Sequence, residues 1–211
     1  DIVPYVGMSH YFRLETNGAG YYASLTGGVL NGPCAAWHAD IAARAKALGF
    51  GVIWSLSYEL FDAHCWNDWK QRAFDGSPAL TGWEPPSALL SPAHGGAMGY
   101  LQSVAKAFVW IAQAAGLEVK FQVGEPWWWV MPDGRLCIHD DAAKSALGDP
   151  AEQNVRHGPD TAVLDAAGAL LAASTAALGA AVREAAADAE LLLLAYLPTV
   201  LDRGAPGLKR A

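Results

Sequence analysis

The sequence predicts an α/β fold in which four parallel strands alternate with three helices. Short apolar runs typical of strands alternate along the chain with longer segments whose apolar residues recur at helical spacing. Strands and helices that alternate in this way build right-handed β-α-β units and a parallel sheet. The links are uneven, because each helix leads almost directly into the next strand whereas long segments follow the strands.

The first half of the chain supplies two strands and one helix. Residues 2–8 form a short apolar run that predicts a strand. Residues 34–48 predict a helix with one apolar face, made by Trp37, Ile41, Ala45 and Leu48. Residues 50–58 predict the second strand, and Glu59 stands just past its end. A further short helix is expected within residues 62–74.

The second half supplies two helices and two strands. Residues 97–115 carry one apolar stripe and predict a helix, with Leu101, Val104, Phe108 and Ile111 on that stripe. Residues 118–123 alternate as a buried strand does. An alanine-rich helix then runs from a cap at Asp160 or Thr161 to about residue 187. Residues 190–197 are nearly all leucine, which predicts a strand covered on both faces.

The long links indicate a barrel and locate its ligand face. They span residues 9–33, 62–96 and 126–158, far more than the about 2–6 residues usual in such units. All three follow strands, and they hold six of the nine tryptophans: Trp66, Trp69, Trp83, Trp127, Trp128 and Trp129. In a (β/α)8 TIM barrel the ligand binds at this carboxyl end of the strands.

The competing fold is a doubly wound sheet, but no glycine-rich nucleotide-binding fingerprint follows the first strand. A full barrel needs eight strands and about 250 residues. We therefore predict one domain over residues 1–211 that forms a partial TIM barrel of about four strands. Its remaining strands are expected beyond Ala211.

Composition excludes several classes of function. The net charge of −7 and pI of about 5.2 argue against nucleic-acid binding. The longest apolar runs are too short to span a bilayer, so no membrane partner is expected. Three scattered cysteines predict neither a disulfide framework nor a zinc site. No cofactor is predicted.

The strongest candidate site residue is Glu125, in the sequence Gly-Glu-Pro-Trp-Trp-Trp. Pro126 ends the third strand, because proline cannot donate to a sheet ladder. A carboxylate therefore stands at the strand tip beside Trp127, Trp128 and Trp129. Two interpretations remain open: a general acid in a sugar-stacking cleft, or a loop whose tryptophans close the top of the core. A general acid would need a raised pKa.

A glycosidase needs two carboxylates, about 5 Å apart if retaining and about 6.5–9.5 Å apart if inverting. Glu59 is the best second carboxylate, because it also follows a strand. The loop triplet His139-Asp140-Asp141 offers a weaker alternative, a metal site, but no metal ligand is assigned. The residues predicted to contact a substrate are His10, Tyr58, Trp66, Trp69, Trp127, Trp128, Trp129 and Tyr196.

Gly124-Glu125-Pro126 resembles the Asn-Glu-Pro signature of a large clan of glycoside hydrolases built on the (β/α)8 barrel. In that clan the glutamate that ends the fourth strand is the acid/base, which the resemblance assigns to Glu125. The chain departs from the clan at Gly124, where an asparagine usually binds the sugar 2-hydroxyl. A counterpart of the clan's nucleophile, a glutamate ending the seventh strand, is not found.

The whole chain is also similar to the glycosidase-like TIM-barrel domains of phage tail proteins and gene transfer agents. This resemblance implies a domain that binds or cleaves carbohydrate, with other phage tail-like proteins as partners and a tail particle as its location. The alternative is a non-catalytic structural or glycan-binding barrel, so whether the chain is an enzyme stays open. We expect Glu59, Glu125 and Tyr196 at one rim, and at least one of Trp127 to Trp129 outside the core.

Overall fold

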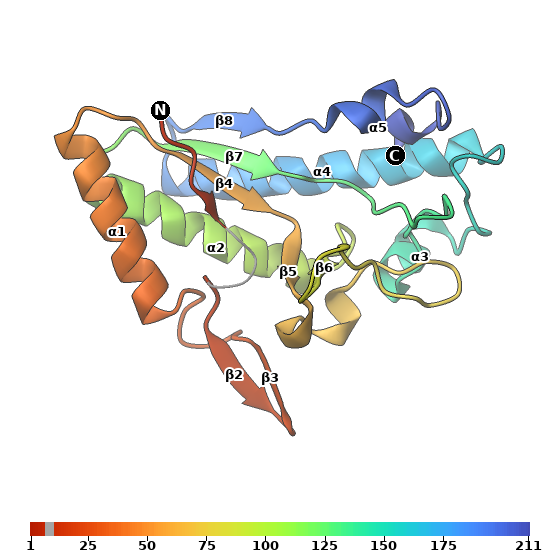
Figure 1. Ribbon diagram of the computed structural model, residues 1–211, viewed down its shortest axis with the longest axis horizontal. Coiled ribbons are helices and arrows are strands. Elements are labelled where there is room, and N and C mark those ends of the chain that lie inside the picture. Colours follow the sequence, from red (N-terminus) through yellow and green to blue (C-terminus); the bar gives the residue numbers. More distant parts are fainter. Residues whose placement is uncertain (7–10) are drawn as a thin grey trace.

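The computed structural model describes residues 1–6 and 11–211, and its centre is a four-stranded parallel sheet (Figure 1). The strand order is β1 (Tyr5–Val6), β4 (Ile53–Ser57), β7 (Lys120–Gly124) and β8 (Glu190–Leu193). The predicted parallel sheet is confirmed. Within the described residues the sheet does not close into a barrel, which agrees with the predicted partial barrel. Part of the predicted first strand, residues 7 and 8, lies outside the described residues.

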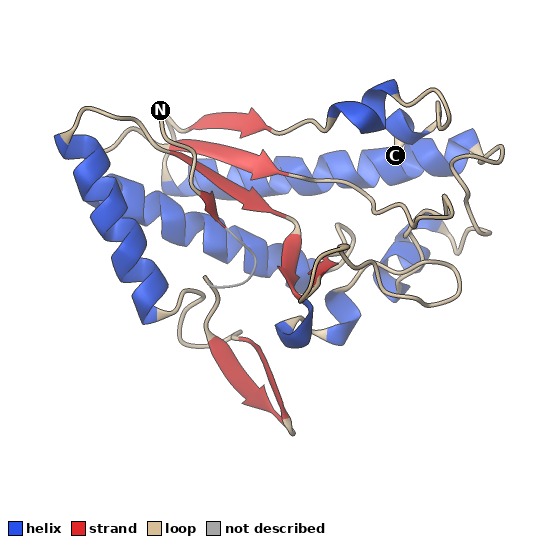
Figure 2. Cartoon of the chain, viewed as in Figure 1, coloured by secondary structure: helices blue, strands red, loops and turns tan. Residues whose placement is uncertain are grey.

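Three long helices pack beside this sheet (Figure 2): α1 (Gly32–Ala47), α2 (Gly95–Ala114) and α4 (Thr161–Ala185). Alternate strand residues face them, so that Trp54 of β4 stacks on Phe108 of α2 with ring centroids 5.4 Å apart. Leu56 and Phe121 belong to the same core. The strand residues between them point to the other face of the sheet and are small or polar, for example Ser55 and Gln122.

Smaller elements occupy the long links that follow the strands. The first link contains an antiparallel hairpin of β2 (Leu14–Asn17) and β3 (Gly20–Ala23). The second contains another antiparallel pair, β5 (Glu59–Phe61) and β6 (Ser87–Leu89). The remaining short helices are α3 (Asp141–Leu147), α5 (Leu197–Leu201) and the 3-10 turn η3 (Leu208–Arg210).

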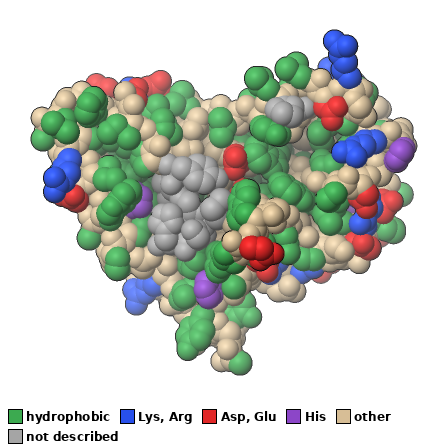
Figure 3. All heavy atoms as spheres, in the orientation of Figure 1, with side chains coloured by type: hydrophobic (Ala, Val, Ile, Leu, Met, Phe, Trp, Pro, Cys, Tyr) green, Lys and Arg blue, Asp and Glu red, His purple; other side chains and the backbone are tan. Residues whose placement is uncertain are grey.

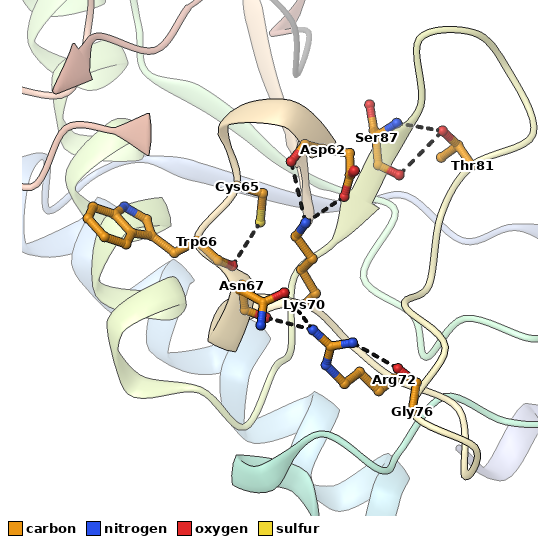
Figure 4. Close-up of polar contacts among 9 residues, drawn as sticks. All are labelled: Asp62, Cys65, Trp66, Asn67, Lys70, Arg72, Gly76, Thr81 and Ser87. Carbon is orange, nitrogen blue, oxygen red and sulfur yellow. Dashed lines mark hydrogen bonds and ion pairs between the residues drawn. The ribbon is translucent and has the colours of Figure 1, made fainter. Parts of the chain in front are cut away.

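The predicted short helix within residues 62–74 is wrong, because this segment forms only two 3-10 turns, η1 (Asp62–His64) and η2 (Asn67–Trp69). Side chains of the segment bond to one another instead of supporting a helix (Figure 4). The Lys70 ammonium lies 2.7 Å from an Asp62 carboxylate oxygen. The Arg72 guanidinium donates to the Asn67 side chain at 2.8 Å and to the Gly76 carbonyl at 2.8 Å.

The predicted apolar face of α1 is wrong at its large residues. Trp37 and Leu48 are 56% and 71% exposed, whereas Ala45, which was predicted on this face, is buried together with Cys34, His38 and Ala42. The His38 ring lies 4.9 Å from the Phe108 ring and 5.8 Å from the Trp54 ring. Close contact with α2 and β4 therefore selects a face of small residues rather than the face with the largest side chains.

The fourth strand was predicted to be covered on both faces, and this is wrong as well. β8 lies at the edge of the sheet, with only β7 as a neighbour among the described strands. Leu193 is 61% exposed, and the chain turns into α5 at Leu197. A run of leucines shows that a strand could be buried, but burial also requires a neighbouring element to cover it.

By its length and composition, α4 could cross a membrane. It packs instead against α2 and β7, and its inner residues Leu164, Leu178 and Val182 are fully buried. Asp160 caps it by accepting a hydrogen bond from the Ala162 amide, as predicted. Its apolar character comes largely from alanine, and 28% of its most apolar stretch is buried inside the protein.

Gly124 is required where β7 approaches β4. A Cβ atom at residue 124 would lie 3.0 Å from the Ser55 hydroxyl oxygen and 3.3 Å from the Leu56 carbonyl oxygen. We expect Gly124→Ala to lower the free energy of unfolding by about 1–3 kcal/mol, because an added methyl overpacks this contact. Urea denaturation measures the change.

Gly99 in α2 provides the matched control, because a Cβ there meets no atom within 4 Å. Gly99→Ala is expected to raise the free energy of unfolding by about 0.5–1 kcal/mol, since alanine is the better helix former. Equal unfolding midpoints for Gly124→Ala and the wild type would contradict the crowding argument.

Candidate functional site: an acidic pocket lined by tryptophans

A cavity of about 390 Å³ lies at the carboxyl ends of β4, β7 and β8. We call it the acidic pocket. It is lined by Glu59, Trp83, Glu125, Trp127, Trp128, Trp129, Val130, Tyr196, Thr199, Asp202 and Leu208. The prediction that Glu59, Glu125 and Tyr196 share one rim is confirmed. One predicted residue thus lies in the acidic pocket after each of three neighbouring strands, β4, β7 and β8.

Glu59 is the buried acid of the pocket. It opens β5 directly after β4 and is only 2% exposed. Its Oε2 atom is buried and has no hydrogen-bond partner among the described residues. Burial first, and then the hydrogen bond and charge of Glu125, raise the pKa of Glu59 to about 8. The carboxyl with the raised pKa is therefore Glu59, and it holds a proton at neutral pH.

Glu125 reaches this partner through an unusual backbone conformation. Its φ of +52° lies in the left-handed region, which costs a non-glycine residue on the order of 1 kcal/mol. Its carboxyl group lies close enough to that of Glu59 to contribute to the raised pKa of Glu59. The approach to the buried acid thus accompanies a strained backbone at the tip of β7.

The two carboxyl groups act on each other. Hydrogen bonding to Glu125 and the charge of Glu125 both add to the effect of burial on the pKa of Glu59. Two acids whose pKa values depend on each other in this way resemble a pair of carboxyl groups that share one proton.

The crowding at Gly124 also removes a feature of the glycosidase signature. An asparagine at this position would place its Cβ against Ser55 and the backbone of Leu56. The close approach of β4 and β7 therefore excludes the side chain that binds the sugar 2-hydroxyl in the clan that Gly124-Glu125-Pro126 resembles.

The three consecutive tryptophans have three different environments, which confirms that they are not all buried. Trp128 is 3% exposed and donates its indole N–H to the Ala167 carbonyl at 2.9 Å. Trp129 is half-buried against a small apolar cluster. Trp127 is half-buried beside Tyr196, with ring centroids 5.6 Å apart. One tryptophan thus anchors the loop, and another forms part of an aromatic wall.

Gln71 fixes this loop and was not predicted from the sequence. It is fully buried, and its Nε2 donates to the carbonyls of Leu90 and Trp127 at 3.1 Å each. Its Oε1 accepts from the Trp129 amide at 2.8 Å. These bonds hold both ends of the Trp127–Trp129 segment. A single glutamine in a long loop carries no sequence signal for such a role.

Three predicted contact residues, Tyr58, Trp66 and Trp69, do not line the pocket. Tyr58 is fully buried; its hydroxyl lies 3.1 Å from the Ser174 hydroxyl, and burial raises its pKa to about 12. Trp66 stacks on Tyr22 with ring centroids 4.8 Å apart, and Trp69 is buried in the main core. His10 lies outside the described residues.

Trp83, Thr199 and Asp202 line the pocket but were not predicted as site residues. Trp83 lies in a long link on the expected ligand face, so its position in the sequence could have identified it as a site residue. Asp202 follows α5 and lines the pocket only because that helix lies beside it. No sequence pattern marks it.

The described residues contain no group of three or more side chains able to hold a metal ion. In the weaker metal candidate, Asp140 caps α3 by accepting from the Ala143 amide at 3.0 Å. Asp141 pairs with Lys144 at 2.8 Å. These carboxylates therefore have structural partners.

The raised pKa of Glu59 predicts a loss of stability as pH rises. Between about pH 5 and 8 the folded protein binds a proton that the unfolded chain releases, so the free energy of unfolding falls by up to about 1.4 kcal/mol per pH unit. Glu59→Gln mimics the protonated acid and should remove this slope, as measured by urea denaturation from pH 5 to 8.

Glu118→Gln is the matched control, because Glu118 is an exposed carboxylate just before β7. It removes one exposed carboxylate and should retain the slope of the wild type. A slope that persists unchanged in Glu59→Gln would show that this carboxyl does not hold the proton.

The sequence of the chain matches a known protein family. A family model described as the TIM barrel of non-contractile tail sheath proteins matches residues 1–211. No curated protein matches the chain. The family match agrees with the parallel sheet and with the predicted resemblance to phage-tail TIM-barrel domains. The chain belongs to the family of TIM-barrel domains of non-contractile tail sheath proteins.

Proposed function

We propose that this chain is a structural domain of a phage-like, non-contractile tail, and that it packs against neighbouring tail proteins. The observation that carries the proposal is the family match over the whole chain.

An exposed apolar surface supports packing against another protein. We define the β8–α5 surface by its exposed residues Leu193, Leu197, Val200 and Leu201. Hydrophobic side chains emerge at the surface over α5 (Figure 3). β8 is also an edge strand, whose outer backbone groups are available to pair with a further strand. Apolar side chains next to an open strand edge are typical of a surface that another element covers.

This proposal predicts the effect of a charge on the β8–α5 surface. Leu197→Glu should reduce incorporation of the full-length protein into tail particles by about tenfold or more, because burying an unpaired carboxylate at an interface costs at least about 1.4 kcal/mol. Quantifying the protein in purified particles measures the effect, and circular dichroism verifies the fold.

Leu48→Glu is the control, because Leu48 follows α1 and is comparably exposed at 71%. It should leave incorporation unchanged. Wild-type incorporation of Leu197→Glu would contradict a contact at this surface.

A second candidate function is carbohydrate binding without cleavage. It is supported by the aromatic wall of Trp127 and Tyr196 beside two carboxyl groups. Such a wall offers faces on which a sugar ring can stack. Cleavage by Glu125 as general acid has less support, because the family match is to a domain of tail sheath proteins and Gly124 stands where the hydrolase clan has asparagine.

A structural role predicts that the full-length protein releases no reducing sugar from bacterial cell-wall or capsular polysaccharide, and that Glu125→Gln behaves identically. The measurement is a reducing-end assay on both proteins at equal concentration. Hydrolysis by the wild type that disappears in folded Glu125→Gln would establish the glycosidase role and refute the proposed absence of catalysis.

A further inference from the structure

We propose that the acidic pocket binds a sugar that carries a free ammonium group, that is, an unacetylated amino sugar of a surface polysaccharide. This inference rests on the second candidate function, carbohydrate binding, and specifies the charge of the ligand. It does not depend on how the domain packs within a tail.

The charged groups among the described lining residues of the pocket all have one sign. They are Glu59, Glu125 and Asp202, and no described lining residue is a lysine, arginine or histidine. Asp202 accepts a hydrogen bond from the Gly204 amide at 2.7 Å, which fixes one of its oxygens. In a partly enclosed site, carboxylates attract a cation more strongly than they do in bulk water.

One acceptor in the pocket has no partner. Glu59 is 98% buried, and its Oε2 atom receives no hydrogen bond from any described residue. A buried acceptor without a donor is costly. An ammonium group supplies three N–H donors and a positive charge. It can therefore donate a hydrogen bond to Oε2 of Glu59, and its positive charge favours the ionised form of that carboxyl group.

The aromatic residues provide the remaining part of the site. Trp127 and Tyr196 lie side by side with ring centroids 5.6 Å apart, and Trp83 is 51% exposed. Their faces can stack on the apolar face of a sugar ring and also attract a cation. The cavity of about 390 Å³ falls within the about 300–1,000 Å³ usual for ligand sites.

A lysine of a neighbouring protein would also supply an ammonium group. Its narrow aliphatic chain needs less aromatic surface than three half-exposed rings offer. The observations therefore favour a ring-bearing ligand, and a lysine becomes one outcome of the test.

Isothermal titration calorimetry of the full-length protein at pH 6.5 provides the test. The probes are the β-1,4-linked trimers of glucosamine, N-acetylglucosamine and glucose, together with a lysine amide. The glucosamine trimer should bind at least tenfold more tightly than its acetylated counterpart, which has the same rings without the charge. Glu125→Gln and Asp202→Asn should each reduce this preference severalfold.

Two further variants separate the contributions. Trp127→Ala should weaken binding of all three trimers, because it removes a stacking face but no charge. Glu118→Gln, outside the pocket, should leave every affinity unchanged.

Equal affinity for the three trimers would overturn the ammonium inference and leave carbohydrate binding standing. No binding of any trimer would overturn both. Tighter binding of the lysine amide than of the glucosamine trimer would identify a protein side chain as the occupant and refute the inference for a sugar.

Discussion

The close approach of β4 and β7 is the constraint on which the site depends. Parallel pairing places Ser57 opposite Gly124, and a Cβ atom at residue 124 would crowd Ser55 and Leu56. The two strands therefore end side by side, and the residues that follow them lie close together. Glu125 is near enough to Glu59 to contribute to the raised pKa of Glu59.

The same constraint bears on the glycosidase-like signature. An asparagine before Glu125 would place its Cβ against Ser55 and the backbone of Leu56, so the approach that brings the two acids together disfavours it. The pocket combines carboxyl groups with an aromatic wall, and the hydrogen bonds of Gln71 hold the loop that carries Trp127. Such an arrangement suits recognition, and it is compatible with a domain whose family belongs to a tail sheath.

Within the described residues the sheet is open, and β8 forms one of its edges. Three helices pack beside it and bury Trp54, Leu56 and Phe121, which accounts for most of the core. At the β8 edge, by contrast, the leucines of β8 and α5 stay exposed. Parallel sheets are stable when other elements cover them. The uncovered β8 edge is therefore the natural place for contact with another protein.

The sequence by itself determined the order of the strands and helices, the parallel sheet and the face on which the site lies. These features depend on local periodicity and on link lengths, which are visible in one chain. Glu125, Glu59 and the three tryptophans followed from their places at strand ends. Tertiary structure alone decided the rest: which face of α1 is buried, that β8 lies at an edge, and that Gln71 and Asp202 reach the pocket. It also placed the proton on Glu59, because the pKa of a carboxyl group depends on burial and on neighbours distant in the chain.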